Sequence, residues 1–312
     1  MKRLFILASA AIVALASCSK TQVVYNDAPE EIGFKAVTGV MTKGPINGTI
    51  LPTSDNMAVY ATKATEVDGA YSEYFSDVEF TFDAGVLWKG KTPQYWPESG
   101  YLKFMAYYPA DCGTRSGTAG GDITISSIDV SSQDDILYAN WTDPQACASK
   151  PEVPMTFKHA LAQIQVKAQV KDNNMKGVKI TKVTIFEPSQ KGTLTIDGST
   201  AEWSGVSAGS TLTMDNDIAD TELTTAAISL GDVGSLVVPG DQTKLIVDYE
   251  ISGLAVTGFE IDLSTAEWEM GKKYIYTLIV GLDEIMIKPD VENWEDGSKV
   301  PVVPEDKIIE AA

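Results

Sequence analysis

The amino-acid sequence predicts an all-β fold made of antiparallel β-sandwiches. Three observations support this class: apolar residues recur at every second position, turn-forming residues separate these runs, and no long amphipathic helix is found. Alternation with period two places successive side chains on opposite faces of a strand, whereas a helix groups apolar residues at steps of three and four. Many short strands with one polar face are typical of antiparallel sandwiches.

The expected strands lie in both halves of the chain. The clearest run is 160–170, where apolar residues from Ile164 to Val170 alternate with polar ones. Further runs lie at 78–82, 102–108, 244–251 and 274–282. Turn signals such as Asp197-Gly198 stand between them. A stretch rich in Pro, Ala and Ser, residues 143–154, separates the halves and predicts two tandem domains, residues 44–153 and 154–297.

The N-terminus has the pattern of an export signal. Lys2 and Arg3 precede an apolar run, residues 4–16, which is too short to span a hydrocarbon core of ~30 Å. The run ends in Leu15-Ala16-Ser17-Cys18, which resembles the lipobox of bacterial lipoproteins. Residues 1–17 are therefore expected to be a signal peptide, cut between Ser17 and Cys18, with Cys18 carrying the lipid. The alternative is an ordinary secretory peptide with an incidental cysteine.

Composition and charge exclude several classes of protein. Without residues 1–17 the chain has 22 basic and 43 acidic residues and a net charge of −21. Such a surface repels phosphate backbones, so nucleic acid is not an expected partner. A hydrophobic content of 44% and six tryptophans exclude a disordered chain. The lipid on Cys18 would attach the protein to a membrane, at least transiently, because each buried methylene contributes ~0.8 kcal/mol.

No residue pattern indicates catalysis, a metal or a cofactor. The single histidine, His159, stands at the start of an expected strand, where a structural role is favoured, and no Gly-x-Ser-x-Gly motif occurs. The acidic residues between Asp215 and Glu222 lack the spacing of an EF-hand and indicate a solvated loop. A glycan hydrolase is supported only by abundant carboxylates and tryptophans. Cys112 and Cys147 could form a disulfide in an oxidising compartment, and the sequence leaves that pairing open.

Several short motifs, in order along the chain, resemble a known family. They begin with the lipobox and end at Val291-Glu292-Asn293-Trp294. Between these stand Phe34-Lys35-Ala36-Val37-Thr38, Thr42-Lys43-Gly44-Pro45-Ile46, Tyr95-Trp96-Pro97, Leu102-Lys103-Phe104-Met105-Ala106-Tyr107-Tyr108-Pro109, Asp134-Asp135-Ile136-Leu137-Tyr138-Ala139 and Met155-Thr156-Phe157-Lys158-His159-Ala160-Leu161-Ala162. In this order they are similar to the fimbrillin-like proteins, the type V pilus subunits of Bacteroidales. The resemblance implies two transthyretin-like β-sandwich domains and a role in surface fimbriae.

The resemblance also implies a maturation step. In the family a surface protease cuts the loop after the first strand, the strand leaves, and an extended segment of another subunit replaces it. Here the released piece would be residues 18–43, cut between Lys43 and Gly44. The family usually has arginine at this position, and lysine is a departure. The strand that would leave has an apolar face formed by Ile32, Phe34, Ala36, Thr38 and Val40.

The C-terminal tail, residues 298–312, is the candidate donor segment. Its apolar residues are Val300, Val302, Ile308 and Ile309. Pro301 and Pro304 bar it from a central strand position with full hydrogen bonding, so it could complement an edge or groove of a neighbour or fold back on its own domain.

The sequence therefore favours a structural pilus subunit, located at the outer membrane, the cell surface and the fimbrium. Its expected partners are other pilus subunits and a surface maturation protease. The alternative is a fimbrial tip or anchor protein, or an adhesin that keeps its lipid and binds glycan or host protein. Aromatic residues expected to be exposed between Tyr71 and Phe75 motivate that alternative.

Overall fold

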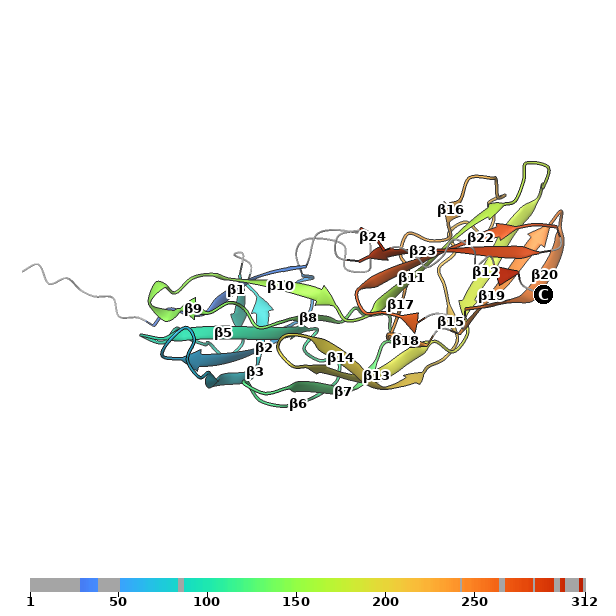
Figure 1. The fold of residues 1–312 in the computed structure, drawn as a ribbon. Helices are drawn as coiled ribbons and strands as arrows, with labels where there is room; N and C mark the ends of the chain where they lie inside the picture. The colour runs from blue at the N-terminus through green and yellow to red at the C-terminus, as the bar shows by residue number, and fades with distance from the viewer. Residues whose placement is uncertain are drawn as a thin grey trace, which may run out of the picture.

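The computed structural model describes residues 29–38, 51–83, 87–241, 243–263, 267–282, 284–294, 298–300 and 309–310. These residues form an elongated molecule in which most long strands run along the long axis (Figure 1). The described part of the chain contains no α-helix and a single 3₁₀ turn, Cys147–Ser149. The all-β prediction is confirmed. Within these ranges no helix is long and apolar enough to cross a membrane.

The largest sheet has eight strands and closes on itself. Its order is β2-β3-β4-β1-β10-β8-β5-β9, and β2 also pairs with β5 from Ala58↔Tyr107 to Ala64↔Tyr101. The strands are β1 (Gly33–Thr38), β2 (Met57–Ala64), β3 (Ser72–Phe82), β4 (Trp88–Gly90), β5 (Tyr101–Tyr108), β8 (Leu137–Ala139), β9 (Gln145–Ala146) and β10 (Val153–His159). Because β2 and β5 join, this sheet is a barrel, which the expected open sandwich did not include.

The prediction of purely antiparallel pairing is wrong at two places. β1 runs parallel to β10, and β11 (Ala162–Val170) runs parallel to β22 (Lys272–Val280). Parallel neighbours need a long connection, and in both cases about a hundred residues separate the two strands in the sequence. The other strand pairs of the described sheets are antiparallel.

A second sheet combines strands from both halves of the sequence. Its order is β14-β13-β7-β6, with β6 (Thr114–Ser116), β7 (Ile123–Asp129), β13 (Ser189–Ile196) and β14 (Ala201–Ala208). The pairing of β7 with β13 crosses the predicted domain boundary, and the boundary itself falls at the first residues of β10. The described sheets therefore do not separate at residues 153 and 154.

The barrel wall formed by β2 and β5 has a hydrophobic core on each side. Val59, Phe104 and Ala106 face the barrel interior, while Tyr60 and Tyr107 face a core shared with β7 and β13. All of these side chains are buried. The predicted apolar face at 102–108 is therefore the inner face of the barrel, and the outer face is covered as well.

The C-terminal half contains two further large sheets and a short ribbon. The seven-stranded sheet has the order β16-β11-β22-β23-β24, with β17 beside β11 and β25 beside β23. The four-stranded sheet has the order β15-β12-β19-β20, and β18 pairs with β21. Their bounds are β12 (Val178–Ile185), β15 (Leu212–Thr213), β16 (Ile228–Ser229), β17 (Ser235–Val237), β18 (Gly240–Asp241), β19 (Lys244–Ile251), β20 (Leu254–Asp262), β21 (Glu267–Trp268), β23 (Ile285–Asn293), β24 (Lys299–Val300) and β25 (Ile309–Glu310). Alternating residues such as Ile164, Val247 and Leu278 fill the core between the two large sheets.

Only two residues, Ala160 and Leu161, connect β10 of the barrel to β11 of the C-terminal sheet. Both are fully buried, and their backbone is held on three sides. The Ala160 amide donates to the Ile136 carbonyl at 2.8 Å, Trp203 Nε1 donates to the Ala160 carbonyl at 2.7 Å, and the Gly271 amide donates to the Leu161 carbonyl at 3.0 Å. The two halves are joined by a short, buried connection that is held by three hydrogen bonds.

Candidate functional site

The first strand is inserted into the barrel between two neighbours. β1 pairs with β10 over five residues, from Phe34↔Val153 to Thr38↔Phe157, and with β4 at Gly33↔Lys89 and Phe34↔Trp88. The pairing starts before the strand, because the Ile32 amide donates to the Gln94 carbonyl at 2.7 Å and the Trp96 amide donates to the Glu30 carbonyl at 2.9 Å. The segment 30–38 therefore completes the sheet between 88–96 and β10.

One face of this segment lies in the barrel core. Ile32 and Phe34 are fully buried and Ala36 is 5% exposed. The ring of Phe34 meets the rings of Phe80 and Phe104 edge-on, each with a centroid separation of 5.0 Å. Lys35 points to the opposite face, where it is half exposed and forms an ion pair with Glu152. The alternation predicted for Ile32, Phe34 and Ala36 is confirmed.

This strand stabilises the barrel because it buries large apolar side chains. Burying a side chain such as Ile32 or Phe34 stabilises the fold by ~1.5–3 kcal/mol. Without the segment, β4 and β10 would each present an unpaired edge, and the rings of Phe80 and Phe104 would line an open apolar groove. We call this space, between β4 and β10 and now filled by residues 30–38, the β1 groove.

The predicted processing sites lie outside the described residues. This holds for Ser17 and Cys18 and for Lys43 and Gly44. Of the strand predicted to leave, Val40 also lies outside the described residues, and the side chain of Thr38 is not described. The structure brings Ile32, Phe34 and Ala36 together in one site and does not test the two predicted cuts.

The described parts of the C-terminal tail pair with β23 of the same chain. Val300 lies opposite Val291 in β24, and Ile309 lies opposite Ile287 in β25. Lys299 Nζ donates to Asp290 Oδ2 at 2.9 Å, and this hydrogen bond raises the pKa of Lys299. Val302 and Ile308 lie outside the described residues. These described residues lie against their own domain, and donation to a neighbour stays a prediction.

The sequence profile of the fimbrillin-like proteins matches residues 41–294. The chain belongs to the fimbrillin-like family. A protein of Bacteroides uniformis named as a fimbrium subunit, Fim1C, is 20% identical to this fimbrillin-like chain and aligns with 95% of it and 96% of its own length.

Solved structures share the fold of this fimbrillin-like protein. A fimbrial protein of Bacteroides vulgatus matches with a TM-score of 0.59 at 16% identity, over 84% of this chain and 99% of that one. A Bacteroides uniformis protein described as a cell adhesion protein matches with a TM-score of 0.52 at 16% identity, over 85% and 99% of the two chains. At this identity the likeness establishes the architecture alone.

The possible disulfide of the fimbrillin-like protein is not formed. Cys112 and Cys147 are both free. Cys147 packs in the barrel beside the start of β5, whereas Cys112 follows its end and packs against the core outside the barrel. A strand of eight residues spans more than 20 Å at about 3.3 Å per residue, which is beyond the ~7 Å limit for the Cα atoms of a disulfide. Burial raises the pKa of Cys112 to about 12.

His159 is buried and contacts Asp135 and Trp294. It is 5% exposed, its Nδ1 lies 2.8 Å from Asp135 Oδ2, and its ring stacks on Trp294 with a centroid separation of 3.7 Å and an interplanar angle of 3°. Asp135 comes from the barrel half and Trp294 from the end of β23. Their contact with His159 could not be predicted from the sequence, because only the fold brings these residues together.

The aromatic residues between Tyr71 and Phe75 are less exposed than predicted. Phe75 is 7% exposed and packs with Phe80 and Phe104 in the barrel, because its side of β3 faces inward. The Tyr74 hydroxyl donates to the Tyr95 carbonyl at 2.7 Å, and Lys103 Nζ lies 4.4 Å from the centre of the Tyr71 ring. The prediction of an exposed aromatic cluster is wrong for Phe75.

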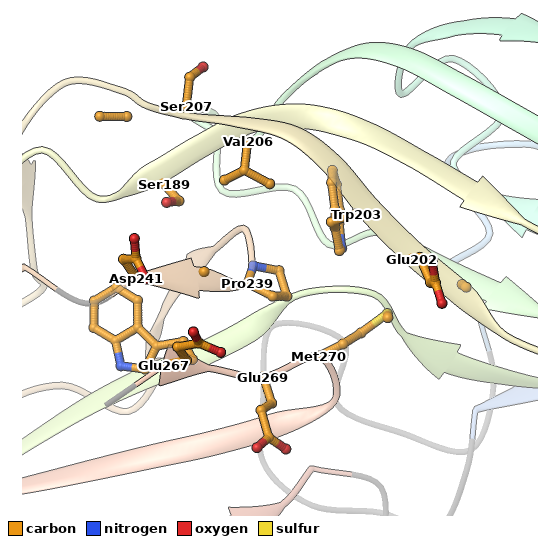
Figure 2. A pocket seen from close by; sticks show the side chains of 14 residues that line it. Ser189, Glu202, Trp203, Val206, Ser207, Pro239, Asp241, Glu267, Glu269 and Met270 are labelled. Carbon is orange, nitrogen blue, oxygen red and sulfur yellow. The ribbon is translucent and has the colours of Figure 1, made fainter. Parts of the chain in front are cut away.

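An open groove of about 730 Å³ lies between β14 and the β18–β21 ribbon (Figure 2). Trp203, Val206, Pro239 and Met270 give it an apolar surface, and Glu202, Asp241, Glu267 and Glu269 bring carboxylates to it. The indole nitrogen of Trp203 already bonds Ala160. Among the described residues no group of three or more His, Cys, Asp or Glu side chains could hold a metal ion.

Proposed function

We propose that this fimbrillin-like protein is a structural subunit of a cell-surface fimbria that assembles by β-strand addition at the β1 groove. The observation that carries the proposal is the position of β1. It is a buried strand in the middle of a closed sheet, yet it belongs to the segment that precedes the predicted cut between Lys43 and Gly44. A matching relative that is named as a fimbrium subunit supports the same role.

Removal of the segment would produce a strong acceptor. An extended peptide can add to two open strand edges through main-chain hydrogen bonds, and the apolar pockets provide selectivity. The two large pockets, those of Ile32 and Phe34, are each worth ~1.5–3 kcal/mol to an occupant that fills them. The tail is proposed as this subunit's own donor, because it is held at the edge of β23 by only two short pairings.

Export and maturation complete the proposal. Cleavage before Cys18 and lipidation would place the precursor on the outer membrane, and a surface maturation protease would then cut at Lys43. Since Cys18 precedes β1 in the sequence, one cut would remove the lipid and the strand together. The mature subunit would comprise residues 44–297, followed by the tail.

N-terminal sequencing of surface material tests the cut. We expect the wild-type subunit to begin at Gly44 and the Lys43→Ala variant to keep Cys18 as its first residue. Lys35→Ala is the matched control, since it removes another lysine upstream of Gly44 that lies exposed on β1. Surface fimbriae built from protein that begins at Cys18 would contradict the proposal.

A second candidate is a lipid-anchored tip or anchor protein, or an adhesin for glycan or host protein. The groove beside β14 favours it, because an apolar surface beside carboxylates suits a polar ligand with an apolar face. Two results together would support this candidate over the structural subunit. The protein would bind a glycan and lose that binding in Trp203→Ala, and deletion of residues 298–312 would leave the SDS-resistant oligomers unchanged.

A further inference from the structure

The β1 groove has pockets of unequal size. Phe34 occupies an aromatic pocket in which Phe80 and Phe104 meet its ring edge-on, and Phe75 packs against both of them. Edge-on aromatic pairs add to the gain from burial alone. Two residues further along, the buried position holds Ala36, and two residues earlier it holds Ile32. The barrel is therefore shaped for an aliphatic, an aromatic and a small residue at every second position.

The tail of the same chain does not have this pattern. Residues 295–312 contain no Phe, Tyr or Trp, so an aliphatic side chain would have to stand in the Phe34 pocket. Such a side chain is smaller than the ring, and the space left would cost binding free energy in the way that a cavity does.

The prolines of the tail add a second mismatch. The segment bonded along the groove runs from Glu30 to Thr38, and every nine-residue stretch of 298–312 includes Pro304. Proline lacks the amide hydrogen that a strand between two neighbours donates. The tail is better suited to an edge, and the described parts of it do lie at the edge of β23.

We propose that the β1 groove selects a donor from a different subunit, one whose donor segment carries an aromatic residue in the Phe34 pocket, and that it discriminates against the tail of its own kind. This rests on the proposed assembly by strand addition. The aromatic pocket is the specificity determinant, with Phe80 and Phe104 as its walls. The subunit then occupies a place in the fimbria where its acceptor side meets a different protein.

Peptide exchange on the full chain tests this. A single protease site inserted between Lys43 and Gly44 is cut, and peptides compete with a fluorescent copy of residues 29–40 for the groove. We expect the 298–312 peptide to compete at least about tenfold more weakly than the unlabelled 29–40 peptide. The substitution Phe34→Val in the 29–40 peptide should lower its affinity for the groove about tenfold. Lys35→Ala in the 29–40 peptide is the control and should bind as the parent does, because this side chain faces away from the pocket.

The outcomes separate the two proposals. A tail peptide that competes as well as the 29–40 peptide, or purified cut protein that forms SDS-resistant oligomers by itself, would overturn the selectivity and leave strand addition intact. A Phe34→Val peptide that binds as the parent does would also overturn it. Cut protein that exchanges no strand at all would contradict strand addition itself.

Discussion

The two ends of the described chain use strand pairing in opposite ways. Near the N-terminus, β1 pairs with β10 over five residues and with β4 over two, and its Ile32 and Phe34 are fully buried. Near the C-terminus, β24 and β25 each pair with β23 over two residues at the border of a sheet. The first segment completes a barrel, whereas the second only extends a sheet. Removal of β1 would expose an apolar groove and two unpaired strand edges. Removal of β24 and β25 would expose only part of one strand edge.

The largest expected effect tests the N-terminal side of this comparison. Phe34→Ala in the uncut chain removes a ring from between Phe80 and Phe104, and we expect the free energy of unfolding to fall by ~3–5 kcal/mol. Denaturant unfolding of the purified precursor measures this. A loss below about 1 kcal/mol would mean that β1 is not part of the barrel core.

Thiol labelling separates the release of β1 from other changes. Cys147 is buried in the same core as β1, and burial raises its pKa, so the unreactive thiol form is favoured at neutral pH. Removing residues 18–43 after the cut should speed its labelling at least about tenfold at pH 8, through loss of core packing. Cys112, which packs outside the barrel, is the internal control and should label at an unchanged rate. Equal acceleration of both thiols would indicate global unfolding instead.

Deletion of residues 298–312 tests the C-terminal side. Two short edge pairings contribute little, so we expect the precursor to lose ~1 kcal/mol at most in denaturant unfolding. If the tail is the donor, the same deletion should also shorten the SDS-resistant oligomers that contain this subunit in cell extracts, because the subunit could then accept a strand but not donate one. A much larger loss would mean that the tail, like β1, contributes strongly to the free energy of unfolding.

The smallest effect concerns the exposed face of β1. Glu152→Gln removes the ion-pair partner of Lys35, and both side chains are about half exposed. Surface ion pairs contribute little, so the free energy of unfolding should change by less than ~0.5 kcal/mol. Comparison with Phe34→Ala, at the residue next to Lys35, would then show that β1 stabilises the fold mainly through its buried side chains. A change as large as that of Phe34→Ala would reverse this assignment.

Sequence alternation predicted which face of a strand is buried, but it did not predict which strands pair with each other. It identified the inward set at 102–108 and the apolar face of Ile32, Phe34 and Ala36, because period two is a local property of one strand. It could not show that β2 closes on β5, that β1 runs parallel to β10, or that β7 pairs with β13 across the expected boundary. These pairings join distant segments, and a single strand's pattern is the same whichever partner it has.

The candidate site was predictable to a similar degree. The alternation showed which residues of the first strand should be buried, and the structure supplied the pocket walls, Phe80 and Phe104. Asp135, His159 and Trp294 each lie in a motif that carries the resemblance, but the sequence did not show that these three separate motifs meet. The separation of Cys112 from Cys147 followed from their places at opposite ends of β5.

The two-residue connection between β10 and β11 has a mechanical consequence. β10 forms one wall of the β1 groove, and β11 forms eight parallel pairs with β22. A pull on whatever strand fills the groove passes directly into β10, through Ala160 and Leu161, and then along β11. Because most long strands follow the long axis (Figure 1), such a load stretches the ladders lengthwise and strains many hydrogen bonds at once instead of opening them one by one. We expect tension on the groove to pass by this route into the C-terminal half.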